Sequence, residues 1–406
     1  MPEAVIVATA RSPIGRANKG SLTQMRPDDL GAQIVRAALA KLPALDPTEI
    51  DDLILGCAQP AGESGFNLAR VVATLAGYDS LPGTTVNRYC SSSLQTTRMA
   101  FHAIRAGEGH AFISAGIETV SRFGKGAADF GENITNPVFD DAVARTAARA
   151  VADALPWTDP RVEQALPDVY ISMGQTAENV AQITGITREE QDRWGVRSHN
   201  RAEAAIADGF FAREITPITL PDGTVVTADD GPRAGTTIEA VSALKPVFRP
   251  DGTVTAGNAC PLNDGAAAVV IMSDTRAAEL GLTPLARIVS TGVSGLSPEI
   301  MGLGPIEATR RALALAGMSV SDIDLFEINE AFAVQVLGSA RELGIDEDTL
   351  NVSGGAIALG HPFGMTGARI TTTLLNNLQT HDKQFGVETM CVGGGQGMAM
   401  VLERLS

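Results

Sequence analysis

The sequence predicts an α/β fold made of two similar halves, with a long insertion in the first half. In each half, a run with apolar residues at helical spacing leads into a short β-rich run. The paired ranges are 35–40 with 50–56, and 309–314 with 323–329. Such a change of period is typical of a helix that packs on a sheet. Its recurrence indicates a duplicated architecture.

A turn that opens a helix follows in each half. The first turn, 86–93, precedes a helix predicted over 94–105, and the second turn, 360–367, precedes a helix predicted over 368–378. Cys90 and His361 therefore take near-equivalent places in the two halves. If the two helix starts meet across a pseudo-twofold axis, this cysteine and histidine share one site, as nucleophilic catalysis requires.

The two halves also end alike, in strands predicted over 265–272 and 397–402. The strand before each of these lies at 112–116 in the first half and at 390–392 in the second, so a long insertion separates the two strands of the first half. A chain of 406 residues with 44% hydrophobic residues suits two or three domains. We predict an N-terminal half over 1–121 and 263–274, an inserted loop domain over 122–262, and a C-terminal half over 275–406.

Composition and charge exclude several classes of protein. The net charge of −16 comes from acidic and basic residues mixed along the chain, which disfavours nucleic acid and anionic membranes as partners. No apolar run reaches the about 18 residues of a membrane helix, and the N-terminus does not resemble a signal peptide, so we expect a cytoplasmic protein. The cysteines lack metal or disulfide spacing, so we expect free thiols and no metal at Cys57, Cys90, Cys260 and Cys391.

Cys90 lies where a predicted strand ends and a helix begins. Ser91, Ser92 and Ser93 follow it and can cap the first turn of that helix. The positive end of the helix and its backbone N–H groups would favour the thiolate over the thiol. By residue type alone a cysteine is more often buried and inert. The polar, turn-forming neighbours favour a nucleophile instead.

Three other positions are candidates for the same site. His361 lies in a turn between a glycine and a proline, although a lone histidine is more often structural. Cys391 precedes the glycines at 393–395, which let a ligand approach and leave backbone N–H groups free for an oxyanion. A dinucleotide-binding loop is the competing interpretation, but no suitable helix or acidic residue follows. Asn329 ends a buried strand, where an ordinary turn residue is the alternative.

Together these motifs resemble those of the thiolase family. Its signature and nucleophile motifs have counterparts at 86–92, 329–332, 360–362 and 391–395. The segments 6–15 and 253–268 also look like the corresponding parts of that family, so the resemblance covers nearly the whole chain. It implies a five-layered αβαβα thiolase fold, built from two βαβαβαββ halves with a loop domain over the active site.

The resemblance also implies a role for each site residue. Cys90 would accept the acyl group, and Cys391 would be the acid and base that moves the α-proton. His361 would assist Cys90 and, with a water held by Asn329, would form one oxyanion hole. The backbone N–H groups of Cys90 and Gly393 would form the second.

For coenzyme A, the matching positions are Arg233 near the nucleotide, and Ala256 and Cys260 along the pantetheine. Met173 and Phe332 would line the acyl end. Acyl-CoA and CoA would be the small-molecule substrates, and transfer between thiols needs no metal or redox cofactor.

Two departures from the family pattern leave the acyl chain length open: Cys260 stands where many members have serine, and Ser172 stands where short-chain members often have histidine. Two smaller changes, Ser93 for a frequent glycine and Thr366 for a frequent serine, are tolerable. The resemblance implies an acetyl-CoA C-acyltransferase that cleaves 3-ketoacyl-CoA, as in fatty-acid β-oxidation, or an acetyl-CoA C-acetyltransferase that condenses acetyl units. Both proceed through an acyl group on Cys90.

The resemblance further implies a homodimer or homotetramer. Two rival functions remain: a ketosynthase of the same fold, which Cys391 in its glycine loop disfavours, and a thiolase-like lipid carrier without catalysis. The presence of Cys90, Asn329, His361 and Cys391 together disfavours the carrier.

Overall fold

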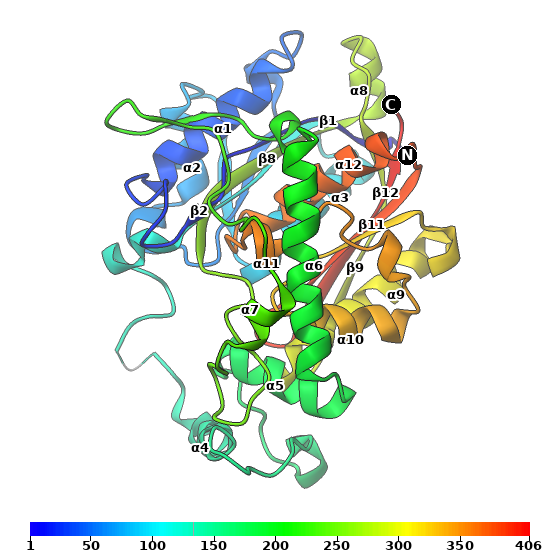
Figure 1. The fold of residues 1–406 in the computed structure, drawn as a ribbon. Helices are drawn as coiled ribbons and strands as arrows, with labels where there is room; N and C mark the ends of the chain where they lie inside the picture. Colours follow the sequence, from blue (N-terminus) through cyan, green and yellow to red (C-terminus); the bar gives the residue numbers. More distant parts are fainter. Residues whose placement is uncertain (133) are drawn as a thin grey trace.

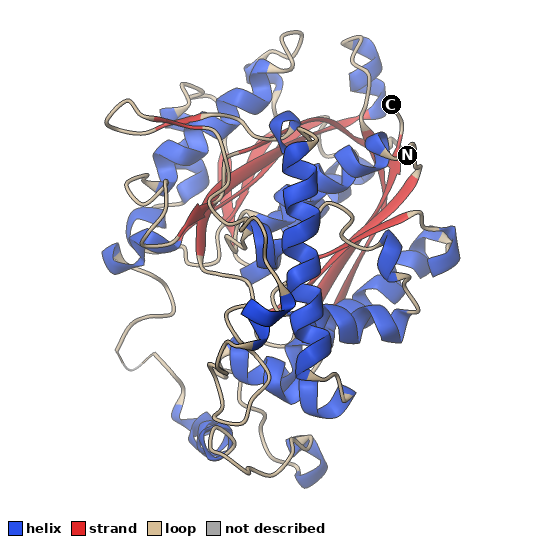
Figure 2. Ribbon diagram, viewed as in Figure 1, coloured by secondary structure: helices blue, strands red, loops and turns tan. Residues whose placement is uncertain are grey.

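Two half-sheets form the centre of the molecule (Figure 2). The computed structural model describes residues 1–132 and 134–406. The central strands in chain order are β1 (Ala4–Arg11), β2 (Gly15–Arg16), β3 (Asp52–Gly56), β4 (Gly83–Val86), β5 (Ala111–Thr119), β8 (Asn263–Ser273), β9 (Ala286–Gly295), β10 (Leu325–Ile328), β11 (Phe385–Val392) and β12 (Gln396–Arg404). Their spatial order is β10-β11-β12-β9-β1-β8-β5-β3-β4, with β2 beside β8. Only two residue pairs join β1 to β9, so the contact between the half-sheets is narrow.

The first half contains the complete βαβαβαββ unit. Its helices are α1 (Pro27–Ala40), α2 (Leu68–Leu75) and α3 (Ser92–Ala106), which alternate with β1, β3, β4 and β5 before the chain returns in β8. β3 pairs with β4 and β5 in parallel, whereas β8 is antiparallel to β5 and β1. This half therefore contains the α/β unit that the sequence predicted to be duplicated.

The second half repeats this order, but a single bridge replaces one of the strands. Its helices are α9 (Gly304–Ala316), α10 (Ala333–Leu343), α11 (Ala356–Leu359) and α12 (Thr366–Thr380). The counterpart of β4 is a single parallel bridge between Leu350 and Phe326. The side chain of Asn351 explains the difference, because its amide accepts from Ile328 N and donates to Ile328 O, both at 2.9 Å. A side chain thus makes the two bonds that a longer strand would have made.

The helices form three layers around the two half-sheets. One core cluster joins α1 and α2 to the first half-sheet, and another joins α9 and α10 to the second. A third cluster contains α3 and α12, which lie between the half-sheets. Most of α12 is buried because both of its sides face a sheet or a helix. The arrangement is therefore the five-layered αβαβα fold.

The predicted loop domain is the stretch between β5 and β8. It contains α4 (Asp140–Ala148), α5 (Met173–Thr184), α6 (Arg188–Ala207), α7 (Ile238–Ser242) and the hairpin of β6 (Ile218–Thr219) with β7 (Val225–Val226). α6 crosses the front of the molecule, while the part around α4 extends away from the sheets (Figure 1). Over the described residues, no helix has both the length and the apolar character to span a bilayer.

Candidate active site

The N-terminal ends of α3 and α12 meet between the two half-sheets. Ala368 N, in the first turn of α12, donates to Ser93 Oγ at 2.9 Å. A Cβ on Gly367 would lie 2.3 Å from the backbone nitrogen of Leu94, so only glycine allows this approach. The turns that precede the two helices carry Cys90 and His361, and this packing brings both turns to the same region.

The three serines after Cys90 do not cap α3, so that prediction was wrong. Ser91 is the N-cap residue but its side chain makes no capping bond. A 3₁₀ turn over Tyr89–Ser91 comes before the helix, and it directs the hydroxyls backward. Ser91 Oγ donates to Arg88 O at 3.2 Å, and Ser92 Oγ donates to Tyr89 O at 2.7 Å. The serines therefore stabilise the turn that holds Cys90, and Ser93 links it to α12.

Cys90 is a thiol at rest. Burial raises its pKa to about 11, and the nearby carboxyl of Glu118 acts in the same direction. The backbone N–H groups of Gly393 and of Cys90 itself oppose this rise. The backbone N–H groups thus act in the direction that the sequence predicted, but burial outweighs them and the net pKa is raised. A base is therefore needed to activate Cys90.

His361 has the geometry of a neutral base. Thr366 Oγ1 donates its single hydrogen to Pro362 O at 2.7 Å, so it accepts from His361 Nδ1–H at 2.6 Å. That bond leaves Nε2 with a lone pair, toward which Asn329 Nδ2 points at 3.4 Å. Burial, followed by the charge of Arg369, lowers the pKa of His361 to about 3. The buried ring stays uncharged near neutral pH.

Three of the four cysteines, all free thiols, lie close together. Cys391 is fully buried near the end of β11, and burial raises its pKa well above the usual range. The charges that Cys90 and Cys260 would carry raise the pKa of Cys391 further, and Cys90 acts on Cys260 in the same way. Cys391 is therefore also protonated at rest and can serve first as an acid.

The glycine loop after Cys391 requires glycine for two reasons. Gly394 and Gly395 have φ angles of 76° and 77°, which side chains rarely adopt. A Cβ on Gly395 would also lie 2.3 Å from Leu296 O. The loop thus keeps the backbone N–H of Gly393 against the thiol of Cys90.

A polar contact that the sequence did not suggest joins the two halves of the site. Arg88 Nη1 donates to Gln396 Oε1 at 2.8 Å, and Gln396 Nε2 donates to Gly393 O at 3.2 Å. The turn before Cys90 and the glycine loop are therefore fixed relative to each other. The signal was weak, because the two residues are far apart in the sequence.

Asn329 and the expected pantetheine residues come together on one side. Asn329 lies just after β10, and its buried Oδ1 has no hydrogen-bond partner among the described residues. Cys260 N donates to Ala331 O at 3.0 Å, and Ala259 pairs with Phe332 as an antiparallel bridge. The loop that carries Cys260 is therefore attached to the segment that carries Asn329.

The residues expected at the acyl end form an apolar group. Met173, the first residue of α5, and Phe248 pack against the core cluster that joins α9 and α10 to the second half-sheet, and that cluster includes Phe332. The rings of Phe248 and Phe332 meet edge to face, with centroids 6.3 Å apart.

Arg233 and Ala256 are exposed on the loop domain. Arg233 N donates to His199 Nδ1 at 3.3 Å. Gly231, two residues earlier, packs on the carbonyls of Ala358 and Leu359, just before the turn with His361. This segment therefore leads from the surface toward the site.

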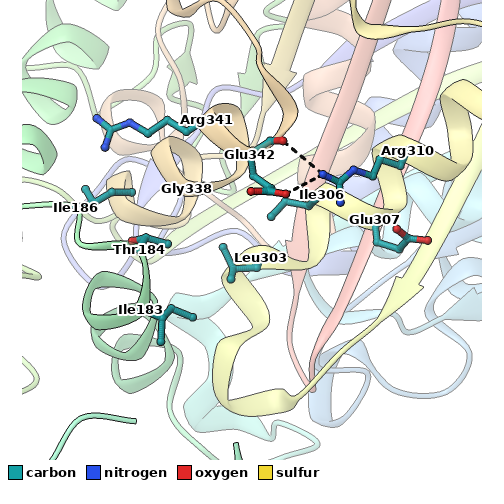
Figure 3. A pocket seen from close by; sticks show the side chains of 10 residues that line it. All are labelled: Ile183, Thr184, Ile186, Leu303, Ile306, Glu307, Arg310, Gly338, Arg341 and Glu342. Atoms are coloured by element: carbon teal, nitrogen blue, oxygen red, sulfur yellow. Dashed lines mark hydrogen bonds and ion pairs between the residues drawn. The ribbon is translucent and has the colours of Figure 1, made fainter. Parts of the chain in front are cut away.

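A surface groove of about 530 Å³ lies away from these residues, among α5, α9 and α10 (Figure 3). An ion pair between Arg310 and Glu342, 2.8 Å long, is part of its wall. None of the predicted site residues lines it. Its lining residues are Ile183, Thr184, Ile186, Leu303, Ile306, Glu307, Arg310, Gly338, Arg341 and Glu342.

Comparisons with known proteins agree over the whole chain. Residues 4–275 match the family model of the thiolase N-terminal domain, and residues 282–404 match that of the thiolase C-terminal domain. The chain is 45% identical to the 3-ketoacyl-CoA thiolase of Bacillus subtilis, over 99% of this chain and 100% of that protein. It is 44% identical to the 3-oxoadipyl-CoA/3-oxo-5,6-dehydrosuberyl-CoA thiolase of Escherichia coli, over 100% of both.

A solved structure supports the same assignment. The dimeric peroxisomal thiolase of Saccharomyces cerevisiae superposes with a TM-score of 0.88 at 34% identity, covering 99% of this chain and 97% of that one. Its similarity extends across both halves and the insertion. From its sequence, its layers and these matches, the chain belongs to the thiolase family.

Proposed function

We propose that this thiolase cleaves 3-ketoacyl-CoA with CoA, reversibly, through an acyl group on Cys90. The observation that best supports this reaction is the gathering of Cys90, Cys260 and Cys391 beside the glycine loop, where the starts of α3 and α12 meet. A nucleophilic thiol and a second thiol for the proton are the two groups that the reaction requires.

In the first half of the reaction, His361 Nε2 takes the proton of Cys90 and the sulfur attacks the 3-keto carbon. The bond between C2 and C3 then breaks, which leaves the acyl group on Cys90. The electron pair passes to C2 as the enolate of acetyl-CoA, and the thiol of Cys391 gives C2 a proton. The protonated resting states of both cysteines and the neutral ring of His361 support this order.

In the second half, the thiol of a new CoA attacks the acyl group on Cys90. Its proton passes to the Cys391 thiolate, and the bond between the acyl group and Cys90 breaks. The departing Cys90 thiolate takes back its proton from His361 Nε2, which restores the starting state. No electrons are gained or lost overall, so we propose no metal or redox cofactor. The same steps in reverse condense two acyl-CoA molecules, since a catalyst accelerates both directions.

An oxygen atom becomes negatively charged in each of two steps. We propose that a separate group of hydrogen-bond donors binds each of these oxygens. The backbone N–H groups of Cys90 and Gly393 would bind the oxygen of the carbon attached to Cys90. His361 and a water held by Asn329 would bind the thioester oxygen of the enolate, and the unpartnered buried Oδ1 of Asn329 supports a water there.

For the substrate, we propose contacts of Arg233 with the nucleotide, of Ala256 and Cys260 with pantetheine, and of Met173 and Phe332 with the acyl group. Met173, Phe248 and Phe332 form an apolar surface, which favours an apolar acyl chain. We therefore propose straight-chain 3-ketoacyl-CoA as the substrate class, with acetyl-CoA condensation as the reverse reaction.

A substrate panel tests this function. Thiolysis of 3-ketoacyl-CoA esters of graded length, with 3-oxoadipyl-CoA included, should give the highest kcat/KM for an unbranched apolar ester. Absence of thiolysis for every ester would refute the proposed function. A preference for 3-oxoadipyl-CoA would refute only the substrate class.

We further propose a homodimer that forms through the free edge of β4. That strand ends the sheet order, and the neighbouring loop presents Phe66 with 95% of its surface exposed. Asn67 binds this loop to β4 through Gly83 O and Thr85 Oγ1. An open strand edge beside an exposed aromatic ring suits a second copy. A cytoplasmic location and a role in β-oxidation stay predictions.

A further inference from the structure

Glu118 is a buried carboxylate whose partners all belong to loops around the site. It lies near the end of β5, where every residue is buried, and only 1% of it is exposed. Its Oε2 accepts from Ala58 N at 2.8 Å and from Gly364 N at 2.9 Å, and its Oε1 accepts from Gln59 N at 3.3 Å. A buried charge is stable only with such donors.

The sheet registers show that Glu118 is the counterpart of Cys391. Glu118 pairs with Gly265 across β5 and β8, and Cys391 pairs with Gly397 across β11 and β12. Gly265 and Gly397 lie near the starts of the matching final strands of the two halves, β8 and β12. The duplicated fold therefore puts a thiol at this position in one half and a carboxylate in the other.

The first loop that Glu118 binds leads to Cys90. Ala58 N donates to Glu118, and Ala58 O accepts from Asn87 Nδ2 at 3.1 Å. Asn87 Oδ1 in turn accepts from Tyr89 N at 2.8 Å, one residue before Cys90. Three consecutive contacts thus connect the carboxylate to the turn of the nucleophile.

The second loop carries His361. Gly364 lies three residues after it and donates its backbone N–H to the same Oε2 atom that binds Ala58 N. A Cβ on Gly364 would lie 2.2 Å from Ile117 O, so the loop packs directly on β5. One carboxylate oxygen therefore joins the loop of the base to the loop of the nucleophile.

We propose that Glu118 is a positioning residue, which sets the placement of His361 relative to Cys90 by binding Gly364 N and Ala58 N with one carboxylate. The inference rests on the proposed roles of Cys90 and His361. Glu118 itself touches neither the substrate nor the reacting atoms. A displacement of about 1 Å between reacting groups can lower a rate by about a hundredfold. A small shift of either loop should therefore lower the rate of the reaction strongly.

Two variants test this placement. Glu118→Gln keeps the length of the side chain but replaces one acceptor oxygen with a donor, and Glu118→Asp keeps the charge but is one methylene too short to reach both loops. For each variant that folds, we expect kcat to fall by about tenfold or more, with KM for CoA changed by less than about twofold. Acylation of Cys90 should slow by the same factor.

Asp324→Asn is the matched control. Asp324 Oδ2 also accepts from two backbone N–H groups, Gln384 N at 3.0 Å and Phe385 N at 2.8 Å. These groups lie at the start of β11, whereas Cys391 lies near its other end. We expect this variant to lower the melting temperature and leave kcat unchanged. If the Glu118 variants also lose only thermal stability, or only raise KM, Glu118 is a structural residue and the inference is wrong. Inactive wild-type enzyme would instead refute the proposed function.

Discussion

His361 is strongly affected by its environment. Its free pKa of about 6.5 falls to about 3 because the ring is buried and lies near the charge of Arg369. The ring thus stays neutral, and able to accept a proton, near neutral pH. Thr366 fixes its tautomer, a role that either threonine or serine can fill.

The lowered pKa of His361 predicts a pH dependence of stability. Above pH 6.5 the ring is neutral in both states. Between pH 6.5 and 3 the unfolded chain binds a proton that the folded protein does not, so folding free energy is lost as pH falls, by about 1.4 kcal/mol per unit. His361→Asn should lack this loss.

Denaturant unfolding at pH 7 and pH 5 measures the effect. From pH 7 to pH 5, the free energy of unfolding of the wild type should fall by about 2 kcal/mol more than that of His361→Asn. Other titrating groups, such as His199, are present in both proteins and cancel in the comparison. An identical change with pH in both proteins would show that His361 titrates normally.

Variants of the two cysteines with proposed catalytic roles should fail at different steps. Cys391→Ala should still take up an acetyl group on Cys90, because the nucleophile and His361 remain. It should lose exchange of the α-protons, since no other thiol is proposed to move them. The test is incubation with acetyl-CoA in deuterated water and isotope analysis of the recovered acetyl group, with Cys90→Ala as the variant that loses acylation. Exchange at the wild-type rate in Cys391→Ala would make His361 the candidate base.

The sequence could predict Cys90, His361 and Cys391 because each stands in a local motif within a repeat. It could not predict how Ser91 or Glu118 is used. Their partners are Arg88, just before the 3₁₀ turn, and Gly364 in the other half, and both contacts depend on where the chain turns and which segments meet. The charged Glu118 within a strand of apolar residues was the one available signal.

At the scale of elements, the glycine loop after β11 should be sensitive to any side chain. Gly395→Ala combines a positive φ with a Cβ only 2.3 Å from Leu296 O. Gly317→Ala, at the end of α9, has a similar φ of 67° but meets no atom within 4 Å. It isolates the cost of the backbone conformation, about 1 kcal/mol.

We therefore expect the free energy of unfolding of Gly395→Ala to be lower than that of Gly317→Ala by about 1–3 kcal/mol. Gly395→Ala should also lower kcat, because the backbone N–H of Gly393 would move away from Cys90. Gly317→Ala should keep the wild-type kcat. Melting curves and steady-state kinetics on both variants decide this. Equal kcat in the two variants would mean that the loop does not place the N–H group.

The elements themselves were partly predictable. The repeated helix and strand pattern predicted β3 and β10 because their apolar runs are bounded by turns. The missing strand of the second half was not predictable, since the side chain of Asn351 substitutes for it through contacts with a distant Ile328. Side-chain mimicry of a strand leaves no periodic signal.

At the scale of the molecule, the dimer depends on the edge of β4. Phe66→Asp puts a charge at the proposed contact and should shift the protein toward the monomer. Leu315→Asp is the control, because Leu315 is 73% exposed on α9, on the outer layer of the other half. Light scattering at micromolar concentration compares the two. A dimer of equal strength in both variants would place the interface elsewhere.

The two-half design itself follows from burial. α3 and α12 are enclosed between the half-sheets, and the turn with His361 before α12 is buried, whereas Cys90 before α3 is half-buried. Proton transfer between thiols and a neutral imidazole benefits from such shielding. We therefore expect Cys90, at this junction, to be the acyl acceptor.

Acid-quenched mass mapping after brief incubation with acetyl-CoA locates the acyl group. We expect an added acetyl group on the peptide with Cys90, and none on those with Cys57, Cys260 or Cys391. Cys90→Ala should carry no acetyl group at all. An acetyl group on another cysteine, with Cys90 unmodified, would show that Cys90 is not the acyl acceptor.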